Sequence, residues 1–119
     1  MLSNIIYVFS HRTGISQRRI LNSGGQIKSL GATAAQRALE SAGISGSDID
    51  LVILATSSPD DLFGDATSVA AAIGATGAVA YDLTAACSGF LFAVVTASQF
   101  LHTGTYRNAV VVGADALSR

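Results

Sequence analysis

The run Ile49-Asp-Leu-Val-Ile-Leu-Ala55 is almost continuously apolar and rich in β-branched residues. These properties are typical of a strand that is covered on both faces, and such strands occur mainly in parallel sheets. A turn of Gly, Ser and Asp at 45–48 precedes the run. Before that turn, apolar residues recur at helical intervals over 29–42, with polar residues on the other side. This pattern predicts an amphipathic helix that leads into a buried strand.

Further elements follow along the chain. The segment 56–65 contains the only proline and three aspartates, which predicts a loop. A short helix is expected over 66–73, and a strand over 78–83 runs almost directly into a long apolar helix that ends near Thr103. Residues 109–113 predict a third strand. Because helices alternate with strands, we expect an α/β fold with a βαβαβ layer and a mostly parallel sheet.

The composition restricts the classes of partner. The 119 residues amount to one domain, of which half are apolar and 13% charged. Seven basic and eight acidic residues give a net charge of −1, so no basic field attracts nucleic acid or an anionic membrane. A single cysteine excludes an internal disulfide and a cysteine-based zinc site, which fits a reducing compartment.

Neither a membrane span nor a signal peptide is predicted. The apolar stretch 85–101 contains four polar residues and is shorter than the roughly 20 residues that cross a bilayer. The oily start, residues 1–9, has no basic region before it and no small-residue cleavage pattern after it. We therefore expect a cytoplasmic protein, or a plastid stromal equivalent.

Cys87 is the main candidate for chemistry. It falls between the strand that ends near Leu83 and the apolar helix that begins near Gly89. Such a position at a helix N-terminus favours the thiolate, which is the reactive form of cysteine. Small residues on both sides suit the sharp turn of a nucleophile elbow. The alternative is a buried structural cysteine, since free cysteines are often buried.

The residues around Cys87 also carry a family resemblance. The string Asp82-Leu-Thr-Ala-Ala-Cys87-Ser-Gly-Phe-Leu-Phe92 resembles the active-site segment of β-ketoacyl-acyl carrier protein synthase III, a thiolase-fold condensing enzyme. Arg12-Thr-Gly-Ile15, the loop Pro59-Asp-Asp-Leu-Phe63 and Val112-Gly-Ala-Asp-Ala-Leu-Ser-Arg119 resemble family segments in the same order. The details look most like the cyanobacterial or plastid branch. The resemblance implies a partial thiolase-like fold with a buried helix after the nucleophile elbow.

The resemblance implies a reaction that starts type II fatty acid synthesis. Cys87 matches the nucleophile that takes an acetyl group from acetyl-CoA, before a decarboxylative condensation with malonyl-acyl carrier protein. Arg12 matches an arginine that contacts coenzyme A. Phe63 falls near the place of a phenylalanine that reaches across a homodimer into the neighbour's acyl pocket. Coenzyme A thioester is thus expected as a substrate, with no permanently bound cofactor and no metal.

The chain also departs from the family. Residues 1–10 do not resemble it, and Val8 stands where the family has a tryptophan that stacks on adenine. We therefore divide the chain into a divergent segment, 1–10, and the N-terminal half of a thiolase-like condensing-enzyme domain, 11–119. The family's catalytic His and Asn belong to the other half. We expect the chain alone to be inactive in condensation.

The remaining polar candidates have simpler explanations. His102 suits the C-terminus of the long predicted helix, and His11 is a loop residue by default. Neither has a second ligand at zinc-type spacing. Asp60, Asp61 and Asp65 could hold a divalent metal, but the first two are ordinary turn residues and Asp65 is well placed as a helix N-cap.

Two alternative hypotheses about the function are compatible with the sequence. One is another thiolase-fold acyltransferase, of the hydroxymethylglutaryl-CoA or polyketide synthase type, and the other is a non-catalytic truncated fragment. In the intact family the helix after Cys87 is covered by the other half. We therefore expect much of its apolar surface to be uncovered here and the chain to self-associate. The residues concerned are Phe90, Leu91, Phe92, Val94 and Val95.

Overall fold

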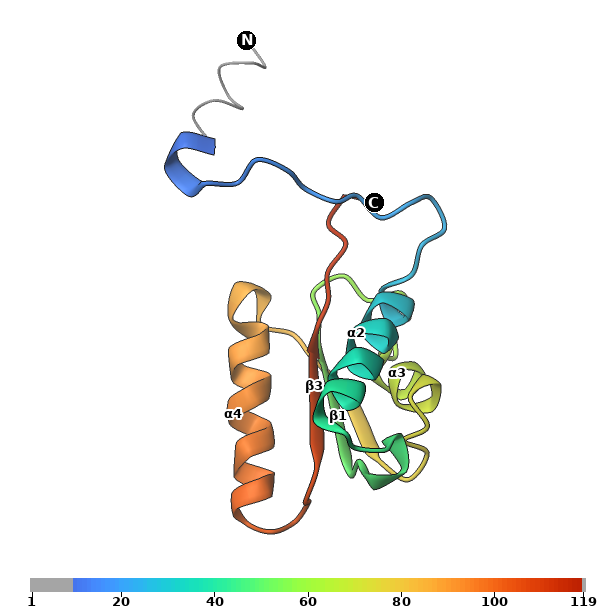
Figure 1. The fold of residues 1–119 in the computed structure, drawn as a ribbon. Helices are drawn as coiled ribbons and strands as arrows, with labels where there is room; N and C mark the ends of the chain where they lie inside the picture. Colours follow the sequence, from blue (N-terminus) through green and yellow to red (C-terminus); the bar gives the residue numbers. More distant parts are fainter. Residues whose placement is uncertain (1–9, 119) are drawn as a thin grey trace.

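The computed structural model describes residues 10–118 and arranges them in three layers (Figure 1). A three-stranded parallel sheet lies in the middle, with helix α4 on one face and helices α2 and α3 on the other. Residues 1–9, Val8 among them, and Arg119 lie outside the described residues. The elements in chain order are α2 (Ile27–Ala42), η1 (Gly46–Asp48), β1 (Leu51–Ala55), α3 (Ala66–Ala72), β2 (Val79–Leu83), η2 (Ala86–Ser88), α4 (Gly89–His102) and β3 (Ala109–Gly113).

The predicted central strand is the central strand of the sheet. The order is β2-β1-β3, with both pairs parallel, and Ile53 of β1 lies opposite Tyr81 of β2 and Val111 of β3. All five residues of β1 are buried. The α/β fold with a parallel sheet is therefore confirmed, and the continuous apolar run is explained by burial on both faces.

Alternate residues of β1 pack into two separate hydrophobic clusters, one on each face of the sheet. Val52 and Leu54 pack with the helices α2 and α3, whereas Leu51, Ile53 and Ala55 pack with α4. This division follows from the two-residue period of a strand, which points successive side chains to opposite faces. The site described below is built on the end of this strand.

Helix α4 is buried on one face only. Its small residues Gly89, Ala93 and Ala97 lie against the sheet. Six of its large apolar residues are 40–61% exposed, although Phe90 also packs on Gly113 of β3. The exposure of five of them was predicted from sequence, namely Phe90, Leu91, Phe92, Val94 and Val95, and the sixth is Leu101. Among the described residues, α4 and the other helices are too short or too polar to cross a membrane.

Asp65 was predicted to cap helix α3 with its side chain, and this prediction is wrong. Asp65 occupies the N-cap position of α3, but its side chain makes no cap hydrogen bond. Instead, the carboxylate of Asp82 on β2 accepts hydrogen bonds from the backbone N–H groups of Asp65 at 3.0 Å and Ala66 at 2.7 Å. A residue 17 positions away thus caps α3, because the sheet brings the end of β2 next to the start of the helix.

Candidate active site

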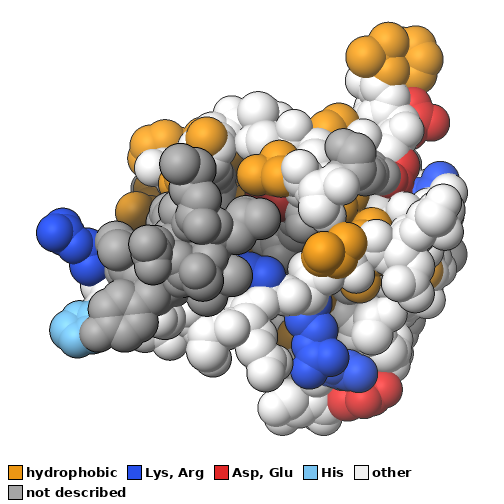
Figure 2. Space-filling model, turned by 90° about the horizontal axis from the view of Figure 1, so that it is seen from above, with side chains coloured by type: hydrophobic (Ala, Val, Ile, Leu, Met, Phe, Trp, Pro, Cys, Tyr) orange, Lys and Arg blue, Asp and Glu red, His pale blue; other side chains and the backbone are white. Residues whose placement is uncertain are grey.

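The candidate site lies where the three parallel strands end. Parallel strands place all their carboxyl ends at one edge of the sheet, and ligands of open α/β sheets bind outside that edge. Thr56 follows β1, Thr84 follows β2, and Asp115 lies two residues after β3. Figure 2 looks down on this edge, where hydrophobic side chains lie at the surface among polar ones.

Cys87 is exposed on a tight turn at this edge. It is the middle residue of the 3₁₀ turn η2, in which Ser88 N–H donates to the carbonyl of Ala85 at 3.0 Å, and α4 begins two residues later. Ser88 provides no side-chain cap to α4. An exposed thiol next to a helix N-terminus without a side-chain cap can act as a nucleophile. The alternative of a buried structural cysteine does not hold for this chain.

The strained residue of the turn is Ala86 rather than Gly89. Ala86 has a φ of +46°, the only positive φ of a non-glycine residue in the described part of the chain. Gly89 has an ordinary helical φ of −56°, and a Cβ there would meet the Cβ of Ala55 at 3.5 Å, a normal contact. The sharp turn predicted from sequence is present, and its unfavourable conformation falls at Ala86, directly before the cysteine.

Asp115 joins the loop after β1 to the end of β3. Its Oδ1 accepts hydrogen bonds from Ser57 N–H at 2.8 Å, Ser58 Oγ at 2.9 Å and Thr56 Oγ1 at 3.2 Å. Ser58 Oγ in turn accepts from Ala116 N–H at 2.9 Å. Asp115 was not predicted as a site residue, although a polar residue soon after a predicted strand is a signal for this edge.

Phe63 stands at the tip of the loop between β1 and α3. Phe63 and its neighbour Leu62 are 95% and 92% exposed. The turn beneath them is fixed, since Asp61 Oδ1 accepts from Phe63 N–H at 2.9 Å and the Asp61 carbonyl accepts from Gly64 N–H at 3.1 Å. Two large apolar side chains are therefore exposed at the tip of a hydrogen-bonded turn.

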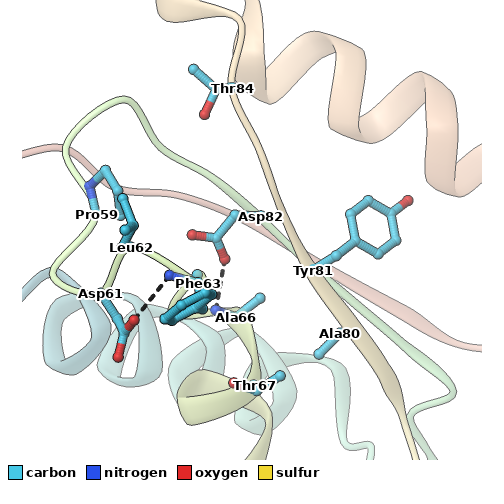
Figure 3. A pocket seen from close by; sticks show the side chains of 11 residues that line it. Pro59, Asp61, Leu62, Phe63, Ala66, Thr67, Ala80, Tyr81, Asp82 and Thr84 are labelled. Atoms are coloured by element: carbon cyan, nitrogen blue, oxygen red, sulfur yellow. Dashed lines mark hydrogen bonds between the residues drawn. The ribbon is translucent and has the colours of Figure 1, made fainter.

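A pocket of about 340 Å³ lies between this loop and β2 (Figure 3). Asp82 points from β2 towards the start of α3, while Tyr81 points to the opposite face of the sheet. Thr84 also lines the pocket, but Cys87 does not. The pocket therefore lies beside the cysteine turn and does not contain the thiol.

The aspartates of the loop bind backbone groups. Asp65 is fully buried, and its Oδ2 accepts from the N–H groups of Asp60 and Asp61, while its Oδ1 has no partner. Asp60 Oδ2 accepts from Lys28 N–H in the first turn of α2 at 3.0 Å. Within residues 10–118, no three His, Cys, Asp or Glu side chains come together as a metal site. Asp60 and Asp61 lie in the loop between β1 and α3, as their turn composition predicted.

The other candidates lie away from the cysteine turn. Arg12 and His11 are exposed in a helical segment, 10–13, that stands apart from the sheet and its helices in Figure 1. The chain then returns to the sheet, where Arg18 and Leu21 help to line a cavity of about 740 Å³ together with Asp115. His102 ends α4, and a helix rise of ~1.5 Å per residue puts it roughly 20 Å from Cys87.

Comparisons with known proteins agree with this geometry. The family model of 3-oxoacyl-[acyl-carrier-protein] synthase III matches residues 81–119, which include Cys87 and Asp115. The β-ketoacyl-[acyl-carrier-protein] synthase III of Trichormus variabilis is 60% identical over 110 residues, covering 92% of this chain and 33% of that protein.

Solved structures extend the similarity to the fold. The 3-oxoacyl-[acyl-carrier-protein] synthase III of Aquifex aeolicus superimposes with a TM-score of 0.88 at 39% identity, over 95% of this chain and 37% of that chain. The priming β-ketosynthase of the R1128 polyketide pathway gives a TM-score of 0.86 at 35% identity, over 91% of this chain and 33% of that chain. Over nearly its whole length the chain is therefore similar to β-ketoacyl-[acyl-carrier-protein] synthase III proteins, and it spans about a third of the length of the relatives it matches.

Proposed function

We propose that this chain supplies the acyl-accepting cysteine of a β-ketoacyl-[acyl-carrier-protein] synthase III that condenses acetyl-CoA with malonyl-acyl carrier protein in the cytoplasm or plastid stroma. One observation carries the proposal. The only thiol of the chain is exposed on a strained turn at the carboxyl edge of a parallel sheet, within a segment that the family model matches.

In the proposed reaction, the Cys87 thiolate attacks the thioester carbonyl of acetyl-CoA. The tetrahedral intermediate collapses with release of the coenzyme A thiolate, which leaves an acetyl thioester on Cys87. Malonyl-acyl carrier protein then loses carbon dioxide, and the resulting carbanion attacks the acetyl carbonyl. Cys87 leaves as thiolate, and acetoacetyl-acyl carrier protein is the product. Acetyl-CoA is thus consumed as a substrate and coenzyme A is released, with no permanently bound cofactor.

Two further residues have proposed roles. Arg12, exposed in the segment 10–13, contacts the phosphates of coenzyme A, since a guanidinium is permanently charged and presents forked donors. Phe63 reaches into the acyl pocket of a second copy in a homodimer. Its 95% exposure on a fixed loop supports this role, because the side chain has no intramolecular cover to lose.

The isolated chain, which spans about a third of its relatives, is proposed to be inactive in condensation. The enolate formed on decarboxylation needs hydrogen-bond donors, and the loss of one such donor costs about 2.7–4 kcal/mol of transition-state stabilisation. His102 lies at the far end of α4 from Cys87 and cannot supply one.

A second candidate is a priming β-ketosynthase of polyketide synthesis, which shares the cysteine chemistry. The TM-score of 0.86 with the R1128 enzyme favours it, but the 60% identity with the Trichormus variabilis relative favours the fatty acid enzyme more strongly.

The test is a chimera in which residues 11–119 replace the matched third of the Trichormus variabilis protein. We expect acetoacetyl-acyl carrier protein from acetyl-CoA and malonyl-acyl carrier protein, and none from the Cys87→Ala chimera or from the 119-residue chain alone. Condensation by the Cys87→Ala chimera would contradict the role of Cys87. Condensation by the isolated chain would show that the catalytic groups lie within it.

A further inference from the structure

The carboxyl ends of all three strands are joined by side-chain hydrogen bonds, and these bonds meet at Thr56. Thr56 N–H donates to the carbonyl of Leu83 at 3.1 Å, and its own carbonyl accepts from Thr84 Oγ1 at 2.8 Å. Its hydroxyl donates to Asp115 Oδ1 at 3.2 Å. Thr56, directly after β1, thus contacts the residue that ends β2 and the aspartate that follows β3.

Asp115 accepts most of the hydrogen bonds in this network. One carboxylate oxygen receives three donors, from Thr56, Ser57 and Ser58, and the backbone beside it is held by the bond from Ala114 N–H to the Ala55 carbonyl at 3.1 Å. Hydrogen bonds to an ionised acceptor are stronger than neutral ones. The conformation of residues 56–58 therefore depends on Asp115.

The network ends at the cysteine turn. Thr84 is the last residue that it holds, and only Ala85 and Ala86 separate Thr84 from Cys87. Ala86 has the unfavourable φ of +46°. Its methyl side chain cannot form a hydrogen bond that would hold this conformation. Such a conformation persists only when surrounding structure fixes it. On the β2 side of the turn, the side-chain hydrogen bond that restrains Ala86 is the one from Thr84 Oγ1 to the Thr56 carbonyl.

We propose that Asp115 is a positioning residue for Cys87, which acts through Thr56 and Thr84 to hold the strained turn that carries the thiol. Asp115 contacts no reacting atom in this role. This inference rests on the proposed function, because it takes Cys87 as the nucleophile. Its consequence is a change in the reactivity of the Cys87 thiol in the folded chain, which is measured without any acyl substrate.

The test is the rate of alkylation of Cys87 by iodoacetamide in the folded 119-residue chain, in which it is the only cysteine. The variants are Asp115→Ala, Asp115→Asn, Thr84→Val and the double variant Asp115→Ala/Thr84→Val. Asn keeps an acceptor oxygen for the same three donors. Thr103→Val is the matched control, since it removes a hydroxyl that donates to the Phe100 carbonyl at the other end of α4.

We expect Asp115→Ala and Thr84→Val each to slow alkylation by at least about twofold, because a turn that samples other conformations presents the sulfur at the helix N-terminus for less of the time. Asp115→Asn should restore the rate to near that of the unchanged chain, and Thr103→Val should not alter it. The double variant should be no slower than the slower single variant. Urea unfolding followed by circular dichroism confirms that each variant is folded during the assay.

An unchanged rate in Asp115→Ala, or single effects that multiply in the double variant, would overturn the proposal. If Asp115→Ala does not fold, Thr84→Val decides alone, and an unchanged rate in that variant would then overturn it. A loss of stability without a change in the alkylation rate would reduce Asp115 to a structural residue. Failure of the acyl-transfer chimera would instead bear on the proposed function and leave these rates unaffected.

Discussion

Gly46 lies in the turn η1 directly against the backbone at the end of α3. A Cβ at this position would come within 1.7 Å of the Ile73 carbonyl oxygen and 2.8 Å of its carbon. Both atoms belong to the main chain and cannot rotate away as a side chain can. The glycine is therefore required by close approach of two backbones, which explains the Gly/Ser composition of the turn before β1.

We expect Gly46→Ala to lower the free energy of unfolding by about 1–3 kcal/mol or more, the usual cost of overpacking. Gly77→Ala is the matched control, because nothing lies within 4 Å of a Cβ there. Urea unfolding of the two variants gives the comparison. Equal stability of both variants would show that the backbone at Ile73 moves away at little cost.

Residues that interact with distant parts of the chain could not be identified from sequence. The turn at Cys87 was predictable, since a strand, small residues and an apolar helix follow one another locally. Asp115 and Thr56 are 59 positions apart, and Asp82 caps a helix that starts 16 positions earlier. Local patterns name the residue types that could make such bonds, but only the sheet order decides which ones meet.

Among the elements, the buried strand β1 was the most predictable and the boundaries the least. The apolar run pointed to a strand from residue 49, whereas β1 begins at Leu51. Asp50 still pairs through its backbone, since its N–H donates to the Asn108 carbonyl at 3.0 Å and its carbonyl accepts from Val79 N–H at 2.9 Å. Its Oδ2 also accepts from Arg107 N–H and Asn108 N–H at 2.8 and 3.1 Å. A polar residue within the run thus marks the junction of two strands.

These two backbone N–H donors hold the pKa of Asp50 below its ordinary value of 3.8, and the bond from Arg107 has the larger effect. A carboxyl group with a lowered pKa in the folded state stabilises the fold fully above its unfolded pKa, and this contribution is lost as the pH falls through the folded pKa. We expect Asp50→Asn to be less stable than the unchanged chain at pH 7. The difference in the free energy of unfolding should shrink as the pH falls below about 4. A difference that stays constant with pH would show that the charge of Asp50 does not contribute.

For the whole molecule, the exposed face of α4 is the main departure from a self-sufficient domain. The helix packs small residues on the sheet and leaves six large apolar side chains 40–61% exposed, with no Asp, Glu, Lys or Arg among its 14 positions. The family resemblance implied a buried helix here, and it also predicted an uncovered face, because the other half covers this helix in the intact family. Helix α4 is buried on its sheet side only.

We expect this face to cause self-association of the 119-residue chain, because burial of each large apolar side chain contributes about 1.5–3 kcal/mol. The variant Leu91→Lys/Val95→Lys, which places charges on consecutive turns of the exposed face, should be monomeric by light scattering. Leu62→Lys, on the exposed loop before α3, is the control and should remain associated. A monomeric unchanged chain that binds no hydrophobic dye would contradict the expectation.

The acyl-enzyme itself offers the most direct test of the role given to Cys87. The chimera that carries residues 11–119 is incubated with acetyl-CoA and without malonyl-acyl carrier protein, then digested and mapped by mass spectrometry. We predict an acetyl group on the peptide that contains Cys87, which is released by hydroxylamine as expected for a thioester and is absent from the Cys87→Ala chimera. An active chimera that carries no acetyl group on Cys87, or carries it on another residue, would contradict this account.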